Sequence, residues 1–188
     1  NAWLTIDPDN IVSIVTPQSE LGQGAFTAVP MMVAEELDIP WENVRHVFAD
    51  ANRHVNNDNL YVTTSTGGST TVSLRHPYIM QAGASARERL RVAAARRWHV
   101  DLDKVTARQG YLTAEHEEQG IIQATYGEFA ADAAEVTLEE EPTIKAYGDW
   151  WLLGQEIPRL DVAVKTDGSA PYPIDITVPG MVYAAVQA

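Results

Sequence analysis

Glu20-Leu21-Gly22-Gln23-Gly24 lies between a predicted β-strand and a predicted helix. The preceding run, Ile11-Val12-Ser13-Ile14-Val15, is short and β-branched, which favours a strand. After it, apolar residues recur at helical spacing over about residues 25–38. Two glycines around an amide side chain let the backbone approach a ligand closely, and the helix aims its unpaired N–H groups there. The stretch therefore favours an anionic or pyrophosphate-bearing ligand.

The elements around this stretch suggest a mixed fold. Strands at about 2–6 and 11–16 flank a polar turn at 7–10 and predict a β-hairpin. A third strand is expected at 44–49 and a polar loop at 50–59. Pro30 predicts that the first helix starts late or bends, because proline is comfortable only in the first turn.

A second glycine-centred segment, residues 64–71, leads into a long predicted helix that ends near residue 98. Small residues at 82–86 indicate that another element approaches this helix closely. Gln109-Gly110 predicts a tight hairpin, and a short strand is expected at 120–123. Thr125 and Glu128 fit a capping box at the start of a helix at about 125–134. One face of the long helix carries Ile79, Gly83, Ala86, Leu90, Ala93, Ala94 and Trp98.

Composition narrows the class of protein. The 188 residues carry a net charge of −13, so general binding to DNA or RNA is disfavoured. The chain has no cysteine, which excludes disulfides, thiolate metal sites and iron–sulfur ligands within it. A group of arginines in one short stretch, Arg87, Arg89, Arg91, Arg96 and Arg97, is interpreted as the solvated face of a helix.

The last part of the chain differs from the rest in its composition. Beyond Gly154, four prolines alternate with short β-like pieces, and the sequence stops within a strand-like run at 181–186. We therefore expect a piece of a longer protein, with a first domain at 1–150, a linker at 151–157 and the start of a second domain at 158–188. The predicted fold class is α+β, a mixed sheet with packed helices.

The residues alone leave two functional interpretations open. Neither glycine-rich loop matches the Walker or dinucleotide-binding fingerprint, and each is more often a plain turn when taken alone. The five histidines show no i, i+4 pairing, so we expect no metal ligands in this chain. One interpretation is a cofactor-binding region of an enzyme. The alternative is a non-catalytic assembly or binding module whose glycine loops are structural turns.

Three stretches together resemble the molybdenum hydroxylases of the xanthine dehydrogenase and aldehyde oxidase type. The first runs from Thr16 to Gly24 and on through Pro30-Met31-Met32-Val33-Ala34-Glu35-Glu36-Leu37. The second is Thr66-Gly67-Gly68-Ser69-Thr70. The third is Pro158-Arg159-Leu160-Asp161, continuing through Lys165, Asp167-Gly168 and Asp175 to Pro179-Gly180-Met181. Within this family, the three stretches most resemble the large subunits of the isoquinoline 1-oxidoreductase branch.

The resemblance implies a role for both loops in binding a molybdopterin dinucleotide, with the cytosine form favoured and molybdenum present in the full complex. Gln23 would hydrogen-bond the cofactor, while Gly22 and Gly24 allow its close approach. The residues expected to bind cofactor are Gly22, Gln23, Gly24, Ala25, Thr66, Gly67, Gly68, Ser69 and Thr70. The stretch from 158 would open the α/β hammerhead domain of the family.

The resemblance also implies what this chain lacks. The catalytic glutamate of the family lies in a Gly-Val-Gly-Glu context, which does not occur in these 188 residues. We therefore expect no catalytic residue, no bound cofactor and no turnover from the chain alone. The whole protein would hydroxylate aromatic N-heterocycles or oxidise aldehydes with water as oxygen source. Its partners would be the rest of the large subunit and a small 2Fe-2S subunit, and the chain alone would self-associate through an exposed apolar face. The sequence favours neither periplasm nor cytoplasm.

Overall fold

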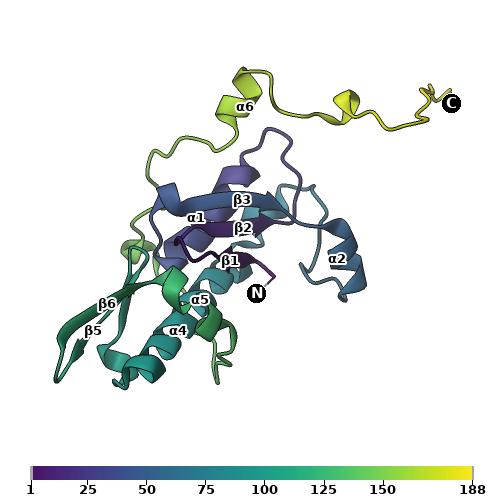
Figure 1. The fold of residues 1–188 in the computed structure, drawn as a ribbon. Helices are drawn as coiled ribbons and strands as arrows, with labels where there is room; N and C mark the ends of the chain where they lie inside the picture. Colours follow the sequence, from purple (N-terminus) through teal and green to yellow (C-terminus); the bar gives the residue numbers. More distant parts are fainter. Residues whose placement is uncertain (1, 188) are drawn as a thin grey trace.

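The computed structural model of the chain describes residues 2–187, and it begins with the predicted hairpin. Strands β1 (Leu4–Ile6) and β2 (Val12–Thr16) pair antiparallel. Helix α1 (Ala25–Leu37) and the 3-10 turn η1 (Trp41–Asn43) then lead to β3 (Val44–Phe48), which pairs parallel with β2. The sheet order is β1-β2-β3, and α1 packs against it (Figure 1). The predicted hairpin, helix and third strand are confirmed.

A second sheet follows the long helix. Helix α3 (Thr70–Ser73) precedes α4 (His76–Trp98), and η2 (Leu102–Lys104) follows it. Strands β4 (Thr106–Arg108), β5 (Tyr111–His116) and β6 (Gly120–Thr125) form an antiparallel sheet in that order. Helix α5 (Tyr126–Ala134) starts with the predicted capping box of Thr125 and Glu128. The hairpin turn has φ of 50° at Gln109 and 78° at Gly110, which matches the right-handed twist of the strands.

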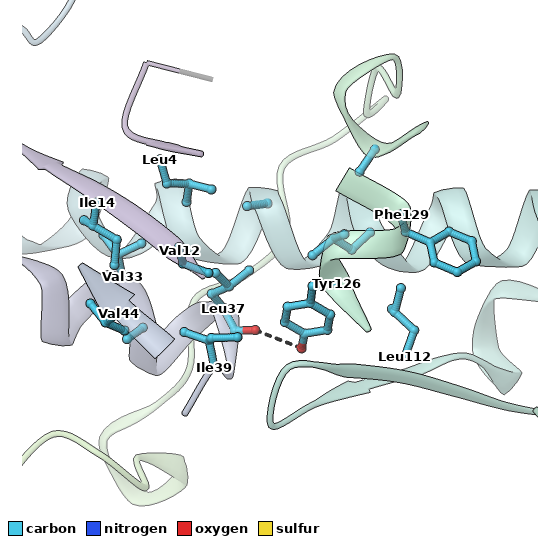
Figure 2. Packing of buried hydrophobic residues seen from close by; sticks show 14 of the residues in the cluster. Leu4, Val12, Ile14, Val33, Leu37, Ile39, Val44, Leu112, Tyr126 and Phe129 are labelled. Carbon is cyan, nitrogen blue, oxygen red and sulfur yellow. Dashed lines mark hydrogen bonds between the residues drawn. The ribbon is translucent and has the colours of Figure 1, made fainter. Parts of the chain in front are cut away.

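The core lies where α1 crosses α4. Val29, Val33 and Leu37 of α1 are fully buried, as are Ile79 and Leu90 of α4. Figure 2 shows this cluster between the first sheet and the second hairpin. A Cβ atom on Gly83 of α4 would lie 2.4 Å from the carbonyl oxygen of Val33. The close approach expected from the small residues of the long helix is therefore confirmed.

Tyr126 joins the two halves of this core. Its ring is fully buried, and its hydroxyl donates to the carbonyl oxygens of Leu37 at 3.0 Å and Asp38 at 3.3 Å (Figure 2). Burial raises the pKa of this hydroxyl above its ordinary value. The amide of Asn10 adds a second link, because it donates to the carbonyl oxygen of Gly110 at 3.1 Å. The two sheets are thus held in one body.

Glu35 ties a distant segment to α1. We call residues 142–153 the strap; it includes η3 (Tyr147–Asp149). The Glu35 carboxylate is fully buried and accepts from the backbone N–H groups of Trp151 at 3.0 Å, Leu152 at 2.7 Å and Leu153 at 3.0 Å. The ammonium of Lys145 donates to it at 3.0 Å. Burial alone would raise the pKa of Glu35, but these donors outweigh it and lower the pKa. The first residues of the predicted linker are therefore anchored on α1.

One expectation for the first half was wrong, and one of two alternatives was excluded. The predicted polar loop at 50–59 contains helix α2 (Ala51–Asn56), because Asp50 caps it by accepting from the N–H groups of Asn52 and Arg53. Of the two alternatives expected from Pro30, a late start is excluded, because helix α1 begins at Ala25 and continues through Pro30 to Leu37. The buried face of α1 outweighs the backbone hydrogen bond that proline removes.

The interpretation of the arginine group as a solvated face was also wrong for Arg87, Arg89 and Arg91, which are half-buried, whereas Arg96 and Arg97 are exposed as expected. Arg91 donates to the carbonyl oxygens of Val105 at 2.9 Å and Leu102 at 3.0 Å. Arg89 donates to the carbonyl oxygen of Val136 and Arg97 to that of Glu128. These arginines fasten α4 to the segments that follow it.

The last segment is residues 158–187, and the part of it after residue 166 extends away from the rest of the chain (Figure 1). Between 158 and 187 it contains helix α6 (Val162–Thr166) and η4 (Pro173–Asp175), and none of these described residues forms the strands that we expected. A strand needs a partner for its backbone groups, and Ile174, Ile176 and Val178 are exposed instead. Of the helices in the described residues, none is long and apolar enough to cross a bilayer.

Candidate functional site

The structure brings the two glycine-rich loops together. The first loop is residues 18–24, which join β2 to α1, and the second loop is residues 63–70, which lead into α3. The backbone N–H of Ser19 donates to the Thr66 hydroxyl at 2.8 Å. The side-chain amide of Gln18, which is 1% exposed, donates to the carbonyl oxygen of Thr63 at 2.8 Å. The loops therefore lie side by side although some 45 residues separate them in sequence.

The N–H groups of the first loop are already engaged. The Glu20 carboxylate accepts from the backbone N–H groups of Gly22 at 2.7 Å, Gly24 at 3.0 Å and Phe26 at 2.9 Å. The sequence predicted that such groups face a ligand, whereas here a side chain of the same loop takes them. A carboxylate at the start of a helix is favoured by the helix dipole.

Gln23 is likewise turned back onto its own loop. Its side-chain oxygen accepts from the N–H of Leu21 at 2.6 Å, and its side-chain nitrogen donates to the carbonyl oxygen of Ser19 at 2.8 Å. Gly22 and Gly24, with φ of 101° and 87°, make the bend that this arrangement needs. Ala25, the first residue of α1, is 2% exposed. The first loop is thus a self-bonded turn.

The second loop offers free donors instead. Within residues 2–187, the backbone N–H groups of Gly67, Gly68 and Ser69 have no hydrogen-bond partner, and all three residues are exposed. Gly68 and Ser69 are both left-handed, with φ of 60° and 56°. The Thr70 hydroxyl donates to the carbonyl oxygen of Gly67 at 3.0 Å and fixes the loop. Successive free N–H groups in a turn form a concavity that attracts anions.

Gly67 also fits close approach by a ligand. Its φ lies outside the left-handed region, and a Cβ atom built on it would meet nothing within 4 Å. The fold therefore does not demand glycine at this position. A glycine with open space in front of it leaves room for a bulky group against the backbone.

Charged residues of the last segment close over the first loop. Arg159 donates to the Gly22 carbonyl oxygen at 3.3 Å and lies 3.4 Å from the Glu20 carboxylate. Arg159 and Lys165 both bond to Asp161, and Lys165 lies 3.9 Å from Glu20. The backbone N–H of Leu160 donates to the Thr27 hydroxyl at 3.0 Å. Two acids and two bases thus fasten residues 159–165 to the start of α1.

The pKa values of the two acids follow from these contacts. Burial alone would raise the pKa of Asp161, but hydrogen bonds from Arg159 and Lys165 outweigh it and bring the pKa to about 2. Burial would also raise the pKa of Glu20, and the N–H groups of Phe26, Gly24 and Gly22 lower it overall.

His46 lies next to this charged group and is stacked on Phe26 with 3.3 Å between ring centroids. Burial lowers the pKa of His46 to about 4, against the opposing effect of Glu20 and Asp161. His46 is therefore neutral at pH 7, and the positive charges facing Glu20 are Arg159 and Lys165.

Asp161→Asn tests this charged group through the pH dependence of stability. The pKa of Asp161 falls from 3.8 to about 2 on folding, so its contribution is present above pH 3.8 and is lost as the pH falls toward 2. We expect the variant to lower the free energy of unfolding by about 1 kcal/mol at neutral pH, a figure discounted because Arg159 is partly exposed. Urea unfolding at a series of pH values measures it. The gap should close as the pH falls through this range, whereas the exposed Asp103→Asn should show no gap. A gap that persists below pH 2 would contradict the assignment.

The sequence analysis missed the roles of Glu20, Arg159, Asp161 and Lys165. A signal for Glu20 was available, since it is an acid shortly before a predicted helix. No local pattern links it to Arg159, which is 139 residues further on. For metals, the described part of the chain holds no group of three histidine, cysteine or acidic side chains that could bind an ion.

Comparisons with known proteins show the family of the chain. A family model described as the molybdopterin cofactor-binding domain matches residues 1–173. The chain is 34% identical over its whole length to isoquinoline 1-oxidoreductase subunit beta of Brevundimonas diminuta. Over 96% of its length it is 30% identical to membrane-bound aldehyde dehydrogenase [pyrroloquinoline-quinone] of Gluconacetobacter polyoxogenes. It spans 28% and 23% of the length of these two relatives.

A solved structure shares the fold. The reconstituted CO dehydrogenase from Oligotropha carboxidovorans superposes with a TM-score of 0.52 at 18% identity. The superposition covers 68% of this chain and 15% of that one. The predicted mixed α+β class with packed helices is therefore confirmed.

Proposed function

Because the chain belongs to the molybdopterin cofactor-binding domain family, we propose that it contributes two loops to the molybdopterin site of a larger molybdenum-dependent oxidoreductase. The proposed cofactor-binding residues are Gly22, Gln23, Gly24, Ala25, Thr66, Gly67, Gly68, Ser69 and Thr70. One observation carries the proposal: the free N–H groups of residues 67–69 lie on a loop that is bonded, through Ser19 and Gln18, to the loop that contains the Gly-Gln-Gly turn.

The two loops have different tasks in this proposal. Gly67, Gly68 and Ser69 donate backbone hydrogen bonds to an anionic group of the cofactor, such as a pyrophosphate. The first loop supports them through the bond from Ser19 to Thr66, and its own glycines, Gly22 and Gly24, are proposed to allow the cofactor to approach the backbone. Backbone donors need no basic side chains, which fits a chain with a net charge of −13.

The whole protein is proposed to hydroxylate N-heterocyclic aromatic compounds or to oxidise aldehydes, with water as oxygen source. When bound, the cofactor supplies the two-electron redox chemistry, and the chain supplies binding and orientation. The proposal includes the cytosine dinucleotide form, a small 2Fe-2S subunit as partner, and a catalytic glutamate outside these 188 residues. It also keeps the domain division at 1–150, 151–157 and 158–188.

A second function is favoured by one observation. The N–H groups of Gly22, Gly24 and Phe26 are satisfied by Glu20, as they would be in a purely structural turn. In a non-catalytic assembly or binding module, the first loop would need to be only such a turn. The experiment below separates the two.

Gly67→Val tests the cofactor site. In the complete subunit, co-expressed with its partner, we expect the molybdenum and pterin content per folded protein to fall about tenfold, which corresponds to roughly 1.4 kcal/mol of lost binding. The added side chain would fill the space in front of the second loop, while stability stays unchanged because nothing lies within 4 Å of a Cβ there. Metal analysis, pterin fluorescence after oxidation and the melting temperature are the measurements.

Gly148→Val is the matched control, because a Cβ at Gly148 also meets nothing within 4 Å and its φ is likewise outside the left-handed region. It should leave the cofactor content unchanged.

Gln23→Ala in the same series tests the first loop and should also lower the occupancy of the cofactor site. A folded wild-type subunit without molybdenum, or one that contains pyrroloquinoline quinone instead, would overturn the proposed function.

A further inference from the structure

Glu20 belongs to the first loop and contacts both the start of α1 and the last segment. Its side chain is 6% exposed although it is an acid on a surface loop. One carboxylate oxygen accepts from the N–H groups of Gly22 and Gly24, and the other accepts from the N–H of Phe26. Charge-assisted hydrogen bonds of this kind are about twice as strong as neutral ones. Glu20 therefore holds the bend of the first loop and the first turn of α1 as one unit.

The first loop, whose bend Glu20 holds, is connected to the second loop by hydrogen bonds. Gln23 lies between the two glycines, and its amide bonds to Ser19 and Leu21 only while the turn keeps this shape. The backbone of Ser19 in turn donates to Thr66 at the head of the second loop. Gln23, Ser19 and Thr66 thus form a hydrogen-bonded chain from the turn that Glu20 holds to the head of the second loop.

Glu20 is in turn held by residues 159–165. Arg159 contacts both the Glu20 carboxylate and the Gly22 carbonyl oxygen, so it spans the bend. Lys165 lies 3.9 Å from Glu20, and Asp161, which is 3% exposed, keeps both cations in place. Leu160 is bonded to α1 through Thr27. The last segment therefore contacts the same three elements that set the loop: Glu20, Gly22 and the start of α1.

We propose that Glu20 is a positioning residue that holds the turn at residues 22–24 in the first loop, which is bonded to the second loop through Ser19, and that docking of Arg159 and Lys165 onto Glu20 prepares the two loops to receive the cofactor. The inference rests on the proposed function and deepens it, because it makes residues 159–165 part of the loading step. Glu20 acts through the backbone of the loop and does not touch the cofactor.

The first arm of the test measures amide hydrogen exchange in the complete subunit with its partner, by mass spectrometry with single-residue resolution. In Glu20→Ala we expect exchange at Gly22, Gly24 and Phe26 to become about tenfold faster, as expected when charge-assisted hydrogen bonds are lost. Glu20→Gln, which keeps one acceptor oxygen, should give an intermediate rate. Arg159→Ala should accelerate the same amides about threefold, since it removes one partly exposed contact. Amides of Val33 and Leu37 should not change, and neither should any amide in the exposed control Glu139→Ala.

The second arm uses the complete subunit with its partner. We expect Glu20→Ala and Arg159→Ala to lower the molybdenum and pterin content per folded protein, measured at a temperature at which every variant is folded, with Glu20→Gln restoring part of it. A purely structural role would lower the yield of folded protein and leave the content per folded protein unchanged. If Glu20→Ala does not fold, Arg159→Ala decides, because its side chain is 40% exposed.

The outcomes separate this inference from the function on which it rests. Faster exchange at the three amides together with lower cofactor content supports it. Unchanged exchange, or unchanged cofactor content, overturns it. A rise in cofactor content in Glu20→Ala also overturns it, since that would mean that the carboxylate competes with an anion of the cofactor. A wild-type subunit without molybdenum defeats the proposed function, and the exchange arm still measures whether Glu20 holds the turn.

Discussion

Gly83→Ala is expected to lower the free energy of unfolding by about 2–3 kcal/mol, because α1 and α4 cross at this residue. An added Cβ would lie 2.4 Å from the Val33 carbonyl oxygen and 2.9 Å from the Glu36 Cβ. Both atoms belong to the α1 framework rather than to the end of a flexible side chain, so the two helices must move apart. Alanine also gains about 1 kcal/mol of helix propensity over glycine, and the stated loss is net of that gain.

Urea unfolding of the variant and of Gly148→Ala measures this effect. Gly148 is exposed, its φ is ordinary, and a Cβ there meets nothing within 4 Å, so this control should change stability by less than about 0.5 kcal/mol. If Gly83→Ala were as stable as its control, the described crossing of α1 and α4 would be wrong.

Glu35→Ala is expected to have the largest effect, a loss of about 3–5 kcal/mol. The substitution leaves the N–H groups of Trp151, Leu152 and Leu153 and the ammonium of Lys145 without their buried acceptor. The strap should then separate from α1 before the rest of the chain unfolds. Urea unfolding gives the loss of stability, and a red shift of tryptophan emission reports exposure of Trp151.

Glu36→Gln is the matched control for this prediction. Glu36 is also fully buried, yet burial raises its pKa, and its second carboxylate oxygen has no hydrogen-bond partner in the described part of the chain. A group with a raised pKa destabilises the fold while it is charged, so a neutral amide should cost little or nothing at pH 7. The amide oxygen can still accept from the N–H of Lys145. If Glu36→Gln cost as much as Glu35→Ala, burial of the side chains would explain the effect and the anchoring of the strap would not.

Local chemistry made much of the fold predictable. Gln109-Gly110 specifies a hairpin turn, Thr125 with Glu128 specifies a helix start, and the small residues around Gly83 specify a close helix contact. Each of these signals involves residues within a few positions of one another. The same is true of the first hairpin, whose turn is closed by the bond from Asn10 N–H to the Asp7 carbonyl oxygen.

The features that the sequence did not reveal depend on distant partners or on context. Glu35 sits within an apolar helix, and its partners lie 110 to 118 residues away. Arg91 looks like a surface residue until η2 and β4 fold back over α4. The β-like pieces after residue 158 form no strand, because a strand is completed only by a neighbour.

The candidate site was predictable only in part, because local spacing identifies the loops but not the contacts between distant residues. Glycine spacing identified both loops, and the structure joins them at Ser19 and Thr66. The sequence could not show that Glu20 takes the donors of the first loop while those of residues 67–69 stay free, because that depends on the exact path of the backbone. We therefore propose that the second loop, rather than the first, makes most of the hydrogen bonds to the anionic group.

The position of the cofactor in a structure of the complete, cofactor-loaded subunit tests the account most directly. We predict that an anionic oxygen of the pterin dinucleotide lies within hydrogen-bond distance of the backbone nitrogens of Gly67, Gly68 or Ser69, with the turn at residues 22–24 on the same side of the group. A cofactor bound elsewhere, with both loops facing solvent or protein, would contradict it.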